Sequence, residues 1–173
     1  MFGLFSKRKQ IRAIAKRLLE QATGMEPLFR MGGLESVEKD AGKCDVTKAP
    51  VLIRTLLVEY ALQNLFALEI RASSATEKEY ETLVCLVAEE MKSNLMFGEQ
   101  AITYWDDLKD VGVAFFGTGR QVAAPETIGR MYGFWFLKNI CYPNLEMHGE
   151  ASLLVGLKLL ENLRRLFKVG SNR

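Results

Sequence analysis

The sequence predicts an all-α protein in which residues 1–173 form a single domain of about six helices in an irregular bundle. Apolar residues recur at the spacings of three and four that one helix face requires through most of the chain. No internal repeat and no alternation of strand and helix patterns accompanies this period, which argues against a parallel sheet. A chain of this length can bury a core without disulfide or metal support.

The first expected helix follows Ser6, a candidate N-cap, and ends where Gly24 and Pro27 interrupt its pattern. Residues 24–46 then hold four glycines and no sustained period. They predict a long irregular connection between the first two helices, and such loops often contact partners.

Two helices are expected next, over residues 47–70 and from about residue 74 to 95. The earlier one tolerates Pro50 in its first turn and is apolar on most sides, which is typical of a central helix. Ser74 and Thr76, each followed by a glutamate three residues later, mark the start of the other. Its inward positions include Val87, Met91 and Leu95, and its glutamates, Glu77, Glu79, Glu81, Glu89 and Glu90, are expected to form a solvated face.

Three further helices are expected at residues 99–110, 125–142 and 149–169. Gly98 interrupts before the first of them, and residues 111–124 fit a loop, a short strand or more helix. The inward positions of the last helix are Leu153, Leu154, Leu157, Leu160, Leu163 and Phe167.

The charge is distributed unevenly along the chain. Residues 1–20 carry six cations and one acid, and residues 154–173 carry five and one, so the total of +2 leaves −7 for the middle. Cations near the end of the last helix stabilise it by ~0.3–1 kcal/mol each through the helix dipole. The same dipole opposes Lys7, Arg8 and Lys9 at the start of the first helix, so helix formation alone does not explain them.

Large apolar residues stand directly before those cations. At an anionic membrane they would enter the headgroup boundary, while each basic residue would contribute about 1 kcal/mol. The alternatives are that they fold back as a hydrophobic staple, or that the segment binds an acidic protein, including the acidic middle of a second copy. Residues 1–9 are thus expected to be either a mobile segment or a surface-attaching one. The candidate contacts with a membrane or an acidic partner are Phe2, Leu4, Phe5, Lys7, Arg8, Lys9, Arg12 and Lys16.

No catalytic or metal-binding motif appears. His148 is the only histidine, which excludes a two-histidine metal site and a carboxylate-bridged di-iron bundle. Cys141 lies near it in sequence but carries no nucleophile signature. We therefore predict no catalytic residue, no metal and no cofactor, and we favour a non-enzymatic function.

The cysteines and the hydropathy predict a location. Cys44, Cys85 and Cys141 are odd in number and include no CxxC pair, which argues against a disulfide framework and favours buried thiols in a reducing compartment. No apolar run reaches the ~18 residues that a spanning helix needs, and the opening lacks a secretory pattern. A cytoplasmic protein, peripheral at the membrane, is expected.

The aromatic-rich residues 104–142 carry the second hypothesis, a small-ligand-binding protein or enzyme with a concave pocket. Two glycines precede Arg120 without completing a dinucleotide or P-loop fingerprint. The candidate partner or ligand contacts are Trp105, Arg120, Phe134, Trp135 and Phe136, for which a place in the core is the alternative.

Nucleic-acid binding is the third hypothesis. Residues 120–132 resemble a helix-turn-helix reader only faintly, because they hold few cations and lead into apolar residues. The sequence thus favours a helical protein-binding protein, an adaptor or regulator whose partner is unknown, with a basic amphipathic N-terminal segment suited to an anionic membrane or acidic surface.

Overall fold

The computed structural model describes residues 2–30, 44–65, 77–116, 125–141 and 149–170. All regular structure in these ranges is helical, which confirms the all-α prediction of about six helices. The elements in chain order are α1 (Phe2–Met25), η1 (Glu26–Leu28), η2 (Val46–Lys48), α3 (Ala49–Leu65), α4 (Glu77–Ser93), α5 (Gly98–Phe116), α6 (Pro125–Ile140) and α7 (Gly149–Gly170), where η denotes a 3₁₀ helix.

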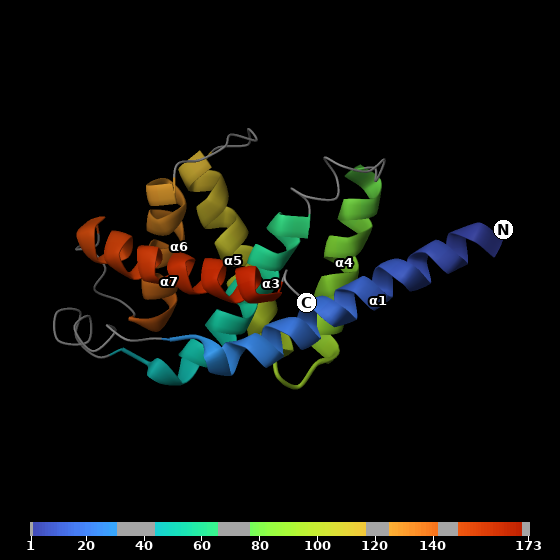
Figure 1. The fold of residues 1–173 in the computed structure, drawn as a ribbon, viewed down its shortest axis with the longest axis horizontal. Coiled ribbons are helices and arrows are strands. Elements are labelled where there is room, and N and C mark those ends of the chain that lie inside the picture. Colours follow the sequence, from blue (N-terminus) through green and yellow to red (C-terminus); the bar gives the residue numbers. More distant parts are fainter. Residues whose placement is uncertain (1, 31–43, 66–76, 117–124, 142–148, 171–173) are drawn as a thin grey trace.

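The helices enclose one hydrophobic core. Figure 1 shows α3 and α5 in the middle, α6 at one end and α4 toward the other, with α7 running from the end at α6 toward α3 and α1 passing α3 and α4. The sequence of α3 is apolar nearly all round, and Leu52, Leu56 and Leu62 on it are fully buried, as expected of a central helix. Residues 66–70 of the expected helix and the capping residues Ser74 and Thr76 lie outside the described residues.

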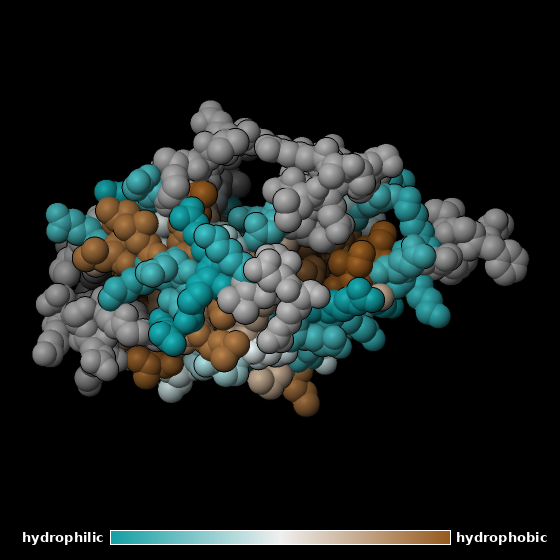
Figure 2. All heavy atoms as spheres, viewed as in Figure 1, coloured by the Kyte–Doolittle hydropathy of each residue, from teal (hydrophilic) through white to brown (hydrophobic). Residues whose placement is uncertain are grey.

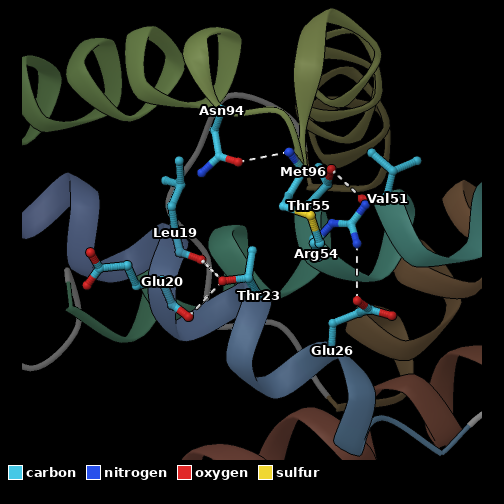
Figure 3. Close-up of polar contacts among 9 residues, drawn as sticks. All are labelled: Leu19, Glu20, Thr23, Glu26, Val51, Arg54, Thr55, Asn94 and Met96. Atoms are coloured by element: carbon cyan, nitrogen blue, oxygen red, sulfur yellow. Dashed lines mark hydrogen bonds and ion pairs between the residues drawn. The ribbon is translucent and has the colours of Figure 1, made fainter.

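A tight turn separates α4 from α5. Gly98 adopts φ 68°, a left-handed conformation that suits glycine, and its N–H donates to the carbonyl of Asn94 at 2.9 Å. The Asn94 side chain accepts from the N–H of Met96 at 2.9 Å (Figure 3). Because α4 ends at Ser93, Leu95 lies in this turn and is fully exposed, and its expected inward position is wrong.

The helix α5 continues through Phe116, so residues 111–116 are helical. Residues 117–124 lie outside the described residues. The start of the predicted long connection, residues 24–46, is helical. The helix α1 reaches Met25, and Pro27 then fits the first turn of η1. Arg54 of α3 pairs with Glu26 of η1 at 3.1 Å, which fixes this turn against the core (Figure 3).

The backbones of α6 and α7 touch where they cross. A Cβ atom added at Gly133 would lie 1.8 Å from the carbonyl oxygen of Ser152, and one at Gly156 would lie 1.6 Å from that of Gly129. Small residues four apart on each helix, Gly129 with Gly133 and Ser152 with Gly156, permit this approach.

The buried face of α7 is narrower than expected. Leu160 and Leu163 are in the core, but Leu154 is 64% exposed and its predicted inward position is wrong. Leu157 lies against Gly129 of α6 but remains 38% exposed, so it is inward only in part. The reason is that α7 packs on the rest of the protein through one face, which carries Ser152, Val155, Gly156, Leu159 and Leu163.

The cysteine prediction is also wrong. Cys44 and Cys141 form a disulfide across a sequence separation of 97 residues, and Cys85 is an exposed free thiol rather than a buried one. Beside the disulfide, the N–H of Asp45 donates to the carbonyl of Ile140 at 2.8 Å. These contacts tie the segment before α3 to the end of α6.

A polar clamp joins α7 to the chain that follows η1. The side chain of Asn162 accepts from the Arg30 N–H and donates to the Arg30 carbonyl, both at 3.1 Å. Arg165 donates to the Leu28 carbonyl at 2.8 Å. Side chains of α7 therefore satisfy the backbone hydrogen-bonding groups of Arg30 and the carbonyl of Leu28.

Candidate functional site

The basic first half of α1 lies against acidic residues of α4. Figure 1 shows α1 passing α4 on its way to its N-terminal end. The two helices are far apart in sequence, so each ion pair fixes a long-range contact. The pairs are Lys7–Glu79, Arg8–Glu89 at 4.0 Å, Arg12–Glu89, and Arg12–Glu90 at 3.3 Å.

These contacts correct two expectations. Glu79, Glu89 and Glu90 do not simply face solvent, because each carboxylate meets a cation of α1. Folding also accounts for part of the N-terminal charge, since Lys7 and Arg12 gain partners. The expected opposition of the helix dipole is wrong, because α1 begins at Phe2 and the cations from Lys7 onward lie beyond its first turn. The sequence did not reveal the pairs because it does not show which helices are neighbours.

A second group of α1 cations faces away from the molecule. Lys9, Lys16 and Arg17 are exposed and make no ion pair with any residue in the described ranges. Ala15, Leu18, Leu19 and Ala22, the buried residues among positions 7–25 of α1, lie on the opposite side of the helix. In Figure 2, hydrophilic side chains gather over the part of α1 in view.

The helix register places the three apolar candidates, Phe2, Leu4 and Phe5, on two different faces of α1. Positions 2 and 5 precede Lys9 by seven and four residues, so on an α-helix they belong to the same outward face as Lys9 and Lys16. Position 4 precedes Ile11 by seven residues and belongs to the inward face. The backbone of Phe2, Leu4 and Phe5 lies in α1, so Phe2 and Phe5 share a register with exposed lysines and Leu4 does not.

The aromatic candidates lie mostly in the core. Trp105, Trp135 and Phe136 have no exposed surface, whereas Phe134 is half-buried. The indole N–H of Trp105 donates to Glu59 at 2.6 Å, and that of Trp135 donates to the carbonyl of Tyr104 at 2.9 Å. A partner could reach the three buried rings only if the helices separated. Arg120 lies outside the described residues.

A polar chain links α3 to α6 inside this aromatic region. The hydroxyl of Tyr132 donates to Gln63 at 3.0 Å, and the Gln63 amide donates to Glu59 at 2.9 Å. Burial raises the pKa of the Tyr132 hydroxyl well above its usual value of 10, and the negative charge of Glu59 adds to the shift.

Replacing Tyr132 with phenylalanine is therefore expected to change how stability depends on pH. Above pH ~10 the unfolded tyrosine ionises while the folded one stays neutral, so the wild-type free energy of unfolding should fall by about 1.4 kcal/mol per pH unit more than that of Tyr132→Phe. Urea unfolding of both proteins between pH 9 and 11.5 measures the difference. Parallel pH profiles would contradict the assignment.

A surface hollow lies beside the C-terminal half of α7. Its volume is about 400 Å³, and Leu157, Leu160, Glu161, Arg164, Arg165 and Lys168 line it. Its walls combine two leucines with charged side chains and include no nucleophile beside a general base.

Metal sites and membrane-spanning helices are two other features that would indicate a function. In the ranges that the structure describes, no cluster of three or more histidine, cysteine, aspartate or glutamate side chains could hold a metal ion. None of the described helices is both long and apolar enough to cross a membrane. Comparisons with protein-family models, curated proteins and solved structures find no match to this chain.

Proposed function

We propose that this protein is a non-enzymatic adaptor or regulator that attaches peripherally to an anionic membrane through the outward face of the first turns of α1. One observation carries the proposal: Lys9 and Lys16 are exposed and unpaired within the described residues, at the register of Phe2 and Phe5. A helix with cations and aromatic residues on one accessible face suits the headgroup boundary.

The expected attachment is weak and reversible. Each lysine near an anionic surface contributes about 1 kcal/mol, and the apolar patch is short. Because the charges are exposed, raising the salt concentration should weaken binding. An adaptor that attaches reversibly can present the rest of its surface to a protein partner at the membrane.

Vesicle co-sedimentation of a double variant tests the proposal. Phe2→Ser with Phe5→Ser should weaken binding to vesicles of phosphatidylserine and phosphatidylcholine by about tenfold or more, because two aromatic side chains leave the headgroup boundary. Thermal stability should be nearly unchanged, since positions 2 and 5 share the helix register of the exposed Lys9 and Lys16.

Leu4→Ser is the matched control, because position 4 lies on the inward face of α1. It should reduce vesicle binding much less than the double variant does. Equal binding of wild type and double variant would contradict the proposal, and so would a large loss of thermal stability in the double variant, which would assign the phenylalanines to the core.

A further inference from the structure

We propose that Glu79, Glu89 and Glu90, the acidic edge of α4, compete with the anionic membrane for the cations of α1 and thereby restrain attachment. This inference rests on the proposed function and concerns its regulation. It treats the contact between α1 and α4 as autoinhibitory.

Ion pairs with α4 neutralise half of the six cations in residues 1–20. Lys7, Arg8 and Arg12 face three carboxylates, so their charges are balanced locally. Arg12 is the most fully engaged, because its guanidinium meets Glu89 through one nitrogen and Glu90 through another. Only cations that face away from α4, such as Lys9 and Lys16, remain unpaired within the described residues.

The pairs are accessible to a competing anion. The side chains of Lys7 and Arg8 are 59% and 65% exposed, and that of Glu89 is 52% exposed. Lipid phosphates could therefore take the place of the carboxylates without unfolding the helices. Arginine suits both partners, because its planar guanidinium matches carboxylate and phosphate alike.

The carboxylates of α4 and an anionic membrane attract the cations of α1 with similar free energies. Exposed ion pairs contribute little to stability, and a basic residue gains a comparable amount at an anionic surface. The carboxylates also repel that surface wherever they stay near it. Removing their charge should thus favour the membrane in two ways, by freeing the cations and by ending the repulsion.

The test neutralises the acidic edge and compares it with a charge-matched control. The variant Glu79→Gln, Glu89→Gln, Glu90→Gln should bind phosphatidylserine-containing vesicles about tenfold more tightly than wild type, and it should not bind neutral vesicles. The control replaces three exposed glutamates that form no ion pair with the described residues of α1, and it changes the net charge equally: Glu81→Gln, Glu99→Gln, Glu126→Gln. It should gain about twofold at most.

A second set of variants tests the same idea without touching α4. If the α4-facing cations are already neutralised, Lys7→Gln with Arg12→Gln should weaken vesicle binding less than Lys9→Gln with Lys16→Gln. This comparison keeps the proposal testable even if the triple glutamine variant folds poorly.

The outcomes separate the inference from the proposed function. If wild type binds anionic vesicles and the triple variant binds no more tightly than its control, the competition is overturned and the attachment stands. If neither wild type nor the triple variant binds, both are overturned.

Discussion

Breaking the disulfide between Cys44 and Cys141 is expected to lower the free energy of unfolding by about 4 kcal/mol. The bond closes a loop of nearly a hundred residues, so it removes much of the conformational freedom of the unfolded chain. In the folded protein it holds the segment before α3 against the end of α6, beside the hydrogen bond from Asp45 to Ile140.

Urea unfolding with and without reductant measures this effect. The double variant Cys44→Ser, Cys141→Ser should match the reduced wild type and should not respond to reductant. Cys85→Ser is the control, because its thiol is exposed and free, and it should behave as wild type. Superimposable curves for oxidised and reduced wild type would show that the bond is absent or contributes nothing.

Replacing Gly133 or Gly156 with alanine is expected to cost at least about 3 kcal/mol of stability. Either methyl group would lie within 2 Å of a backbone oxygen of the facing helix, so α6 and α7 must move apart. Because those oxygens belong to the backbone, no side-chain rotation relieves the clash. The separation would also disturb the packing of neighbouring buried residues such as Leu160.

Two other helical glycines provide controls. Around a Cβ atom at Gly24 nothing lies within 4 Å, and at Gly112 the nearest atom is the sulfur of Met131 at 3.7 Å. Alanine at either position should leave stability unchanged or raise it by about 0.5–1 kcal/mol through helix propensity. Equal thermal melting of Gly156→Ala and Gly24→Ala would refute the close crossing.

The sequence predicted the helices well because their signals are local. Apolar periodicity identified the inward face of α1 from Ile11 to Ala22, and the all-round apolar pattern identified α3 as central. Gly98 was expected to interrupt the chain, and it does so through its left-handed turn.

Long-range contacts could not be predicted in the same way. Arg12 and Glu89 are 77 residues apart, and the two disulfide cysteines are 97 apart, so no local pattern connects them. The close crossing of α6 and α7 does have a local signal, because Gly129 with Gly133 and Ser152 with Gly156 follow the four-residue spacing of small residues at close helix contacts.

The disulfide removes one argument for the predicted cytoplasmic location. A disulfide is typical of oxidising compartments, so the cysteines no longer support a cytoplasmic protein. The cytoplasmic location therefore stays a prediction without that support. The proposed membrane attachment does not depend on the cysteines, because it uses the exposed face of α1.

Co-sedimentation of the oxidised wild-type protein with vesicles is the most direct test of attachment to an anionic membrane. Neutral phosphatidylcholine vesicles and vesicles that also contain phosphatidylserine would be compared at low and moderate salt. We expect binding to the anionic vesicles alone, and we expect it to weaken as the salt concentration rises. Absence of binding to anionic vesicles at low salt, or equal binding to neutral vesicles, would contradict it.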